Sequence, residues 1–508
     1  MQLPQITTYC KDKRIQKCFF SAVFWGLLSY LYCFMNNLNN YDNIACTPGG
    51  YGTGMQSGRW FLSLLGECVK DVWGNYNLPF FNGLLSILFM GISACMVIEI
   101  LEIKNEWFCA LLGGITVVFP PIASGMLFSF TVHYYTLAIL LSVAGVWCVK
   151  QRKIVLYILG GLLFACSLGI YQAYFPFAAS LLILTLIKMC LDETYSWKQV
   201  LLASFKFLSA LLIGYILYRI LLQICLVVYD QSLNSYQGIN EMGNIDLRQL
   251  PHMVIQTYKD LLKLPLRDYM SITATRVLQH GVFWIYIICF VSAILFFMRK
   301  NVLKSIALVV LVALFPIAVN SIIIMVPNGN VYTLMAMALV AVFYLPLVFV
   351  DNITVTREKL TKLLTIPTVA VLFICTLNYT WLNNGNYRAL YYSNKQLENY
   401  YSTLYTRIKS TENYRQDQRI LFIGSKITDN TYKNNWNSTP FRYGGNEARL
   451  NTYSRASSII NYLGYSYHAI AFNSDEYKKY ESEIQTMSCY PDDGSIRVVD
   501  DVVLVRLE

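Results

Sequence analysis

Long apolar runs, separated by short polar stretches, fill the first three quarters of the 508-residue chain. A helix needs roughly 20 apolar residues to cross the hydrocarbon core of a bilayer. The runs therefore predict an all-α polytopic membrane protein with about eleven transmembrane helices. The predicted spans are residues 18–36, 79–102, 108–120, 126–149, 154–171, 173–190, 200–229, 281–298, 303–326, 331–350 and 363–383.

The pattern changes in residues 384–508, which are rich in Tyr, Asn, Ser and charge and whose apolar runs are as short as strands. Residues 388–410 have helical spacing, whereas 419–424 (RILFIG) and 498–507 (VVDDVVLVRL) each read as a buried strand. We therefore divide the chain into a transmembrane domain, 1–383, and a small C-terminal α/β or α+β domain.

Composition and charge support this division and orient it. The chain is 56% hydrophobic and 14% charged, which is typical of membrane proteins, and its net charge of +10 is unevenly distributed. The loops 119–126, 171–175 and 327–331 carry no Lys or Arg. The basic residues instead end alternate spans, at Lys11, Lys13, Arg14, Lys17, Lys150, Arg152, Lys153, Arg299, Lys300, Lys304, Arg357, Lys359 and Lys362. This positive-inside bias predicts a cytoplasmic N-terminus and an extracytoplasmic C-terminal domain, and it argues against nucleic-acid binding.

Three long segments fall on the predicted external side: 37–78, 230–280 and 384–508. Long segments outside the membrane usually carry function, so we expect the functional site on this side. Cys46 and Cys68 share the first of them and could form a disulfide. The sequence has no CxxC or Cys/His spacing typical of a metal site.

The first external segment holds a lone carboxylate, Asp42, close to the end of the first span. A carboxylate at the membrane surface could act as a general base, or it could simply cap a turn. A Gly-rich stretch, 49–58, would let backbone approach a ligand closely. Arg59 and Trp60 then open an amphipathic segment that is predicted to lie in the interface plane, so both could equally be interfacial anchors.

Further candidates lie at the external ends of later helices. Tyr171 and Gln172 mark a break between two spans, where they could bind a sugar or belong to the ordinary aromatic belt. Arg219 lies in the outer half of its span, where it could bind a lipid phosphate or snorkel to the headgroups. In the second segment, Tyr236 and Gln237 precede a predicted basic surface helix near 253–266.

Three motifs together carry a resemblance: NYDN at 40–43, SGRWF at 57–61 and SLGIYQAYFP at 167–176. Their placement resembles the GtrII-like glucosyltransferase family, bacterial membrane enzymes of the GT-C architecture that decorate O-antigen and other cell-surface polysaccharides. The likeness covers residues from about 15 to 400. It implies a polyprenyl-phosphate-sugar donor, usually of glucose, and a polysaccharide or lipid-linked glycan acceptor. The site would face outward from the inner membrane of a bacterial cell.

On this resemblance, Asp42 takes the role of general base, and the reaction is a single displacement that inverts the anomeric carbon. Arg219, helped by Arg59, would stabilise the phosphate of the leaving group. The predicted substrate-lining residues are Tyr41, Trp60, Tyr171, Gln172, Tyr174, Tyr236 and Gln237. Because Tyr41 and Asn43 flank Asp42, the doubled acidic pair of many GT-C enzymes is missing, which argues against a bound Mg²⁺ or Mn²⁺ ion.

Two other classes fit the hydrophobic body. A lipid-linked sugar flippase or other transporter would have similar spans, but these spans carry few ionisable residues for ion coupling and show no repeat. A non-catalytic scaffold for envelope assembly is the other alternative. The three external segments favour the enzyme.

Overall fold

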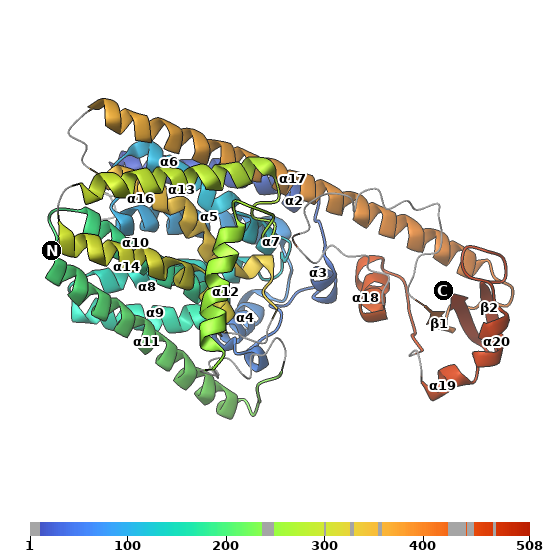
Figure 1. The fold of residues 1–508 in the computed structure, drawn as a ribbon. Coiled ribbons are helices and arrows are strands. Elements are labelled where there is room, and N and C mark those ends of the chain that lie inside the picture. Colours follow the sequence, from blue (N-terminus) through green and yellow to red (C-terminus); the bar gives the residue numbers. More distant parts are fainter. Residues whose placement is uncertain are drawn as a thin grey trace.

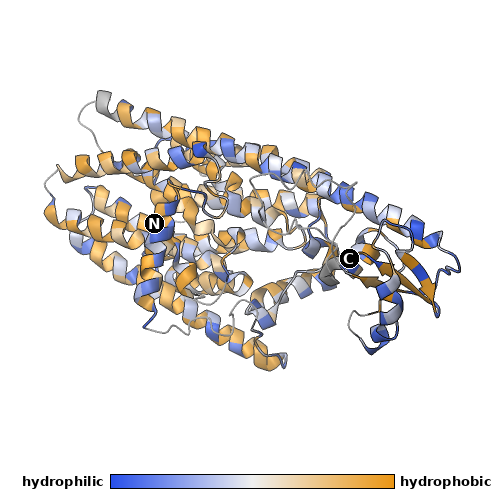
Figure 2. Cartoon of the chain, turned by 45° about the vertical axis from the view of Figure 1, so that its right-hand side comes forward, coloured by the Kyte–Doolittle hydropathy of each residue, from blue (hydrophilic) through white to orange (hydrophobic). Residues whose placement is uncertain are grey.

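The computed structural model of the protein is mainly helical. It describes residues 11–235, 248–298, 301–325, 330–353, 358–424, 443, 452–470 and 474–508. Figure 1 shows a bundle of long helices that run in nearly opposite directions in turn, with the C-terminal domain beyond the end of the bundle that lies away from the N-terminus. Hydrophobic residues dominate the bundle, whereas hydrophilic ones become frequent towards the C-terminal domain (Figure 2). The predicted fold class is confirmed.

Among the described residues, eight helices are long and apolar enough to cross a membrane. They are α2 (Lys13–Met35), α5 (Pro79–Leu101), α8 (Val132–Lys150), α10 (Phe175–Leu191, with the preceding turn η2, Gln172–Tyr174), α11 (Trp197–Val228), α13 (Arg276–Phe297), α14 (Val302–Val319) and α17 (Glu358–Lys409). Two shorter apolar helices, α9 (Ile154–Ile170) and α16 (Ala341–Asn352), occupy two further predicted spans.

The remaining predicted span is a bent pair of helices. α6 (Glu106–Val118) and α7 (Pro120–Met126) pass the length and hydropathy test together, with an angle of 45° between them. Pro120 and Pro121 have no amide hydrogen to continue the hydrogen-bond ladder of α6, so the helix breaks at Phe119 and restarts in a new direction. Eleven spans were predicted, and the described residues contain eight helices that pass this test, or nine if the bent pair is one span; α9 and α16 are apolar but shorter.

Ion pairs join the helices at the basic end of the bundle. Arg14 of α2 lies 3.0 Å from Glu99 of α5, and Lys150 of α8 lies 2.7 Å from Glu102. Lys188 of α10, whose side chain is 1% exposed, also pairs with Glu102. A buried ammonium group is tolerated only when it is paired, so these contacts fix the helix ends to one another. Arg14, Lys150 and Lys188 thus lie at one end of the bundle, and the positive-inside bias predicts that this end faces the cytoplasm.

Short helices cover the opposite end. They are α3 (Tyr41–Ala45), η1 (Met55–Ser57), α4 (Trp60–Trp73), α12 (Leu250–Lys263), α15 (Ser321–Met325), η4 (Thr333–Met335) and η5 (Met337–Val340). The amphipathic segment that follows Arg59 forms the helix α4, and the helix predicted near 253–266 is confirmed as α12, which runs across the long helices in Figure 1. Cys46 and Cys68 are free thiols, so the disulfide considered between them does not form.

The C-terminal sheet has three strands: β1 (Arg419–Ile423), β2 (Ile496–Val499) and β3 (Val502–Arg506), in the order β1-β3-β2. β1 pairs with β3 in parallel, and β2 pairs with β3 antiparallel. The strand predicted at 419–424 is confirmed, but the single strand predicted at 498–507 is wrong. Asp500 and Asp501 have φ of 45° and 68°, which forms a tight two-residue turn and folds this stretch into a hairpin.

Helices complete the C-terminal domain, and one of them continues from the bundle. α18 (Thr452–Ser457), η7 (Ser458–Tyr462), α19 (Asp475–Lys478) and α20 (Glu481–Thr486) connect the strands. α17 runs without interruption for 52 residues, through the boundary predicted at 383/384. Its last turns pack Leu404 and Ile408 against Ile420 and Val503 of the sheet. The change in composition near residue 384 therefore falls inside a helix.

The close contact between α2 and α6 allows the packing of these two helices to be tested by substitution. A methyl group on Gly113 of α6 would lie 2.3 Å from the carbonyl oxygen of Cys18, so Gly113→Ala must push the two helices apart. We expect a loss of about 1–3 kcal/mol, seen as a lower midpoint of thermal unfolding in detergent. Gly125→Ala in α7 is the control, because a methyl there meets no described atom within 4 Å. Equal midpoints for both variants would contradict the packing.

Candidate functional site

Arg59 lies over a pair of stacked tyrosine rings at the start of α4. Its Nη1 donates hydrogen bonds to Thr53 Oγ1 at 2.7 Å and to Tyr135 Oη at 3.1 Å. The guanidinium carbon is 4.7 Å from the ring centroid of Tyr171, and the rings of Tyr135 and Tyr171 stack with centroids 4.6 Å apart and planes at 15°. This cation–π and hydrogen-bond arrangement fixes the direction of the charged group.

The break between α9 and α10 is tied to the segment that carries Arg59. Gln172 is buried in turn η2, and its Nε2 donates to the backbone oxygen of Ser57 and to Tyr218 Oη, both at 3.1 Å. Tyr218, from α11, in turn donates to the backbone oxygen of Gly58 at 3.1 Å. A buried amide and a buried hydroxyl thus satisfy two backbone carbonyls of the first external segment.

Trp60 and Tyr174 are buried residues that pack beside Arg59 and Tyr171. Trp60 is 5% exposed and lies against α9, where a methyl on Gly169 would come within 2.6 Å of its Nε1 atom. The glycine therefore leaves the space that the indole fills. Tyr174 is 2% exposed, and its ring meets that of Tyr171 edge-on, with centroids 5.1 Å apart. We call Arg59, Tyr135, Tyr171, Gln172 and Tyr218 the Arg59 cluster.

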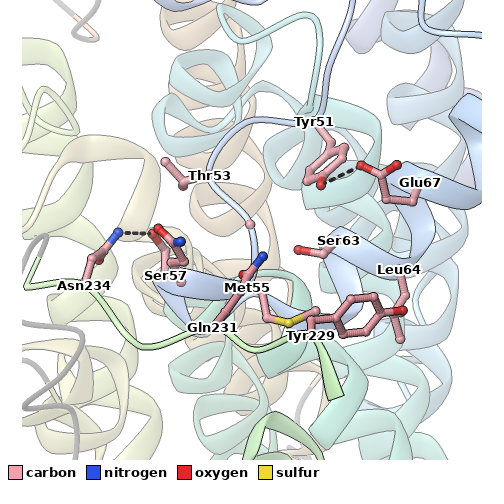
Figure 3. A pocket seen from close by; sticks show the side chains of 12 residues that line it. Tyr51, Thr53, Met55, Ser57, Ser63, Leu64, Glu67, Tyr229, Gln231 and Asn234 are labelled. Carbon is pink, nitrogen blue, oxygen red and sulfur yellow. Dashed lines mark hydrogen bonds between the residues drawn. The ribbon is translucent and has the colours of Figure 1, made fainter. Parts of the chain in front are cut away.

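A pocket of about 570 Å³ adjoins this cluster, between the first external segment and the residues that follow α11 (Figure 3). In it, Tyr51 Oη donates to Glu67 Oε1 at 3.0 Å, and Asn234 Nδ2 lies 3.5 Å from Ser57 Oγ. The lining residues are Tyr51, Thr53, Gly54, Met55, Gln56, Ser57, Ser63, Leu64, Glu67, Tyr229, Gln231 and Asn234. Thr53 and Ser57 belong to both the pocket wall and the contacts of the Arg59 cluster.

Asp42 lies on the short helix α3, half-buried at the same end of the bundle. Asn40 caps this helix by accepting a hydrogen bond from the backbone N–H of Asn43 at 2.8 Å. Burial raises the pKa of the Asp42 carboxyl to about 6, and no cation among the described residues offsets this effect. A carboxyl with a pKa near 6 is deprotonated at neutral pH and can still accept a proton readily.

Both the bundle and the C-terminal domain hold α3 in place. Asn43 Nδ2 donates to the backbone oxygen of Leu127, at the end of α7, at 2.7 Å. From the other side, Asn461 Nδ2 of η7 donates to the backbone oxygen of Ile44 at 3.1 Å. The C-terminal domain also reaches α7, where Ser124 Oγ donates to the backbone oxygen of Tyr443 at 2.6 Å. The helix that carries Asp42 is therefore placed between the two parts of the chain.

Comparison with known families gives a match over most of this region. The family model described as Glucosyl transferase GtrII matches residues 31–344, which is more than half of the chain. The chain belongs to the GtrII glucosyl transferase family. The comparisons with curated proteins and with solved structures found no match.

Membership of the GtrII family confirms the resemblance seen in the sequence. Together with the apolar helices, it makes this protein a multi-pass membrane glycosyltransferase. The matched residues include α3, the Arg59 cluster and every residue of the pocket, whereas the C-terminal domain lies beyond the match. The site and the family assignment thus fall on the same part of the chain.

The structure brings five of the predicted site residues of this GtrII protein together. They lie where the start of α4 meets the turn η2, and they are Arg59, Trp60, Tyr171, Gln172 and Tyr174. Tyr41 and Asp42 lie on α3 and make none of the hydrogen bonds that connect the Arg59 cluster. The predicted residues Tyr236 and Gln237 lie outside the described residues.

Arg219, the other residue predicted to bind the donor phosphate, belongs to α11. It follows the buried Tyr218 on α11, but its own side chain is exposed on the outer surface of the bundle, beside the exposed Ile216 and Ile220. It does not line the pocket. A phosphate-binding role for Arg219 stays a prediction that concerns the membrane-facing surface.

Sequence reasoning missed Tyr135, Tyr218 and the wall formed by Tyr51, Glu67 and Asn234. Tyr135 and Tyr218 each lie among other aromatic residues in long apolar helices, which is an ordinary composition for a span. Two signals pointed towards the pocket: the Gly-rich stretch 49–58, which supplies much of its lining, and the prediction that segments 37–78 and 230–280 lie on one side of the membrane.

A divalent metal does not fit the residues around Asp42. Its chain neighbours Tyr41 and Asn43 offer a phenol and an amide, and Mg²⁺ prefers carboxylate, phosphate and water oxygens. In the described parts of the chain, no group of three or more His, Cys, Asp or Glu side chains is placed to hold a metal ion.

Proposed function

We propose that this GtrII-family protein transfers a glucosyl group from a polyprenyl-phosphate-sugar donor to a polysaccharide or lipid-linked glycan, on the outer face of the bacterial cell membrane. The family match over residues 31–344 carries the proposal, because it includes both Asp42 and the Arg59 cluster. The external location is supported by the basic residues at the opposite end of the bundle.

Asp42 has the chemistry of the general base in this reaction. The carboxylate accepts the proton of an acceptor hydroxyl while that oxygen forms a bond to the anomeric carbon. The bond between the anomeric carbon and the phosphate oxygen breaks, and the lipid phosphate leaves with the electron pair. A single displacement of this kind inverts the anomeric configuration. The raised pKa of Asp42, about 6, supports this role because it matches proton transfer near neutral pH.

Arg59 is the best candidate to stabilise the departing phosphate. A guanidinium group can donate two parallel hydrogen bonds to phosphate oxygens, and Arg59 is held in one direction by hydroxyl groups and by the ring of Tyr171. A fixed donor aimed at developing charge lowers the barrier more than a mobile one. Arg219, exposed on the bundle surface, would meet the lipid phosphate as the donor approaches from the bilayer.

Arg219→Lys tests this approach route. The substitution keeps the charge but loses the two-pronged geometry, so we expect the KM for the donor to rise by about threefold to tenfold with little change in kcat. Steady-state kinetics at varied donor concentration measure both constants. A wild-type KM in the variant would remove Arg219 from donor binding.

The proposed function is tested with the purified full chain in nanodiscs. A radiolabelled polyprenyl-phosphate glucose is added with envelope glycans, and label in the glycan is followed over time. Transfer of label supports the proposal. Movement of the labelled donor across vesicles that contain the protein, without any transfer to glycan, would instead support the flippase alternative.

A further inference from the structure

The pocket beside the Arg59 cluster has a lining that suits an uncharged, hydroxyl-rich ligand. No Lys or Arg is among its lining residues, so no lining side chain carries the positive charge that favours a phosphate. Its polar groups are hydroxyls, amides and one carboxylate. Its volume of about 570 Å³ is within the range of small-molecule sites. From these features we propose that the pocket is a binding subsite for a neutral pyranose ring, an inference that rests on the proposed function.

Glu67 provides the strongest polar contact in the pocket. Its carboxylate accepts a hydrogen bond from Tyr51 at 3.0 Å and pairs with Lys70 at 2.9 Å, which lies outside the lining. Lys70 and Tyr51 hold the pKa of Glu67 below its usual range, so the group is ionised. An ionised carboxylate has about four acceptor positions, and its two neighbours leave acceptor capacity for sugar hydroxyls.

The wall of the pocket that faces Glu67 provides amide and hydroxyl groups. Asn234 is held at this wall because its backbone N–H donates to the carbonyl of Gln56 at 2.9 Å and its side chain reaches Ser57. Figure 3 shows the Tyr51–Glu67 pair and the Asn234–Ser57 pair on opposite sides, with Met55 between them. A sugar ring presents hydroxyls around its edge and C–H groups on its faces. Polar walls with an apolar residue between them match that pattern.

The position of the pocket connects it to the reaction. Thr53 of its wall accepts the hydrogen bond from Arg59, and the backbone oxygen of Ser57 accepts from Gln172. A sugar in the pocket would therefore lie next to the guanidinium group proposed to bind the donor phosphate. Two sugars meet there during transfer: the glucosyl group of the donor and the terminal sugar of the acceptor. Both are neutral pyranoses, so the lining residues suit either one.

The test measures sugar binding and transfer in the full chain in nanodiscs. Binding of methyl α-D-glucopyranoside is followed by saturation-transfer-difference NMR in the wild type, in Glu67→Gln and in Asn234→Ala. We expect each variant to bind the glucoside roughly tenfold more weakly, because a charge-assisted or wall hydrogen bond is lost. Asp71→Asn is the matched control, since Asp71 is exposed on the same helix as Glu67 and is not part of the lining.

Transfer kinetics then identify which sugar occupies the pocket. A higher KM for the donor in Glu67→Gln assigns the pocket to the glucosyl group, and a higher KM for the acceptor assigns it to the terminal acceptor sugar. Wild-type glucoside binding together with wild-type KM values in both variants would overturn the subsite. If that result accompanied transfer that still depended on Asp42, only the subsite would fail. If the wild type transferred no sugar, the proposed function would fail, and the binding data would still decide the subsite.

Discussion

Asp42→Asn is expected to lower the rate of glycosyl transfer by about 10²- to 10⁴-fold, the usual contribution of a general base. Asparagine keeps the size of the side chain but cannot accept the proton of the attacking hydroxyl. Because the substitution leaves the pocket and the Arg59 cluster intact, the KM for the donor should change little. Initial rates of label transfer at saturating donor and acceptor measure the effect.

The pH dependence provides an independent check of the same residue. Burial raises the pKa of Asp42 to about 6, and only the deprotonated form acts as a base. The wild-type kcat/KM should therefore rise with pH through a midpoint near 6, and the residual activity of Asp42→Asn should lack this rise. Asp71→Asn, an exposed change in the same external segment, should behave as the wild type. A fully active Asp42→Asn enzyme would remove Asp42 from the chemistry.

Arg59→Lys should produce the second largest effect, a loss of about 10- to 1000-fold in kcat/KM. Lysine keeps the positive charge but cannot bind Thr53 and Tyr135 through one planar group while lying over Tyr171. The charge would no longer be fixed where the phosphate departs. Donor kinetics separate a rise in KM from a fall in kcat, and the proposed role predicts that both occur.

Two further arginine variants make this result interpretable. Arg267→Lys is the control, because Arg267 is exposed in the residues that follow α12 and takes no part in the Arg59 cluster. Arg219→Lys probes the surface of α11. If Arg59→Lys kept wild-type kinetics while Arg219→Lys lost activity, the phosphate would be stabilised at the membrane-facing surface instead of at the tyrosine pair.

The spans were predictable because crossing a bilayer demands long apolar runs whatever the surrounding structure. The sequence did not predict which side chains of those spans point into the bundle and which point outward. α11 is apolar on all sides, so the sequence had no way to indicate that Tyr218 points into the bundle and Arg219 out of it. Tyr135 was missed for the same reason. The residues of a site in such helices become visible only when the packing of neighbouring helices is known.

Local backbone chemistry explains the error in the C-terminal domain. The run VVDDVVLVRL has enough β-branched residues for one strand, but two adjacent aspartates can adopt positive φ more easily than most residues. Pairing β2 with β3 across Asp500 and Asp501 buries Val503 and Val505 against α17. The turn is favoured by this burial, which is a tertiary effect that the strand pattern did not contain.

The length of α17 determines how the C-terminal domain can move. At about 1.5 Å per residue, its 52 residues extend for about 78 Å, from the basic end of the bundle to the sheet, and it packs on α2, α6 and α13 on the way. The domain is therefore joined to the bundle by a continuous helix and not by a flexible linker. A displacement of the domain would therefore be transmitted along α17 to the helices on which it packs. A tilt of the domain would also reach α3, and so Asp42, because Asn461 of η7 donates a hydrogen bond to the backbone oxygen of Ile44 at 3.1 Å.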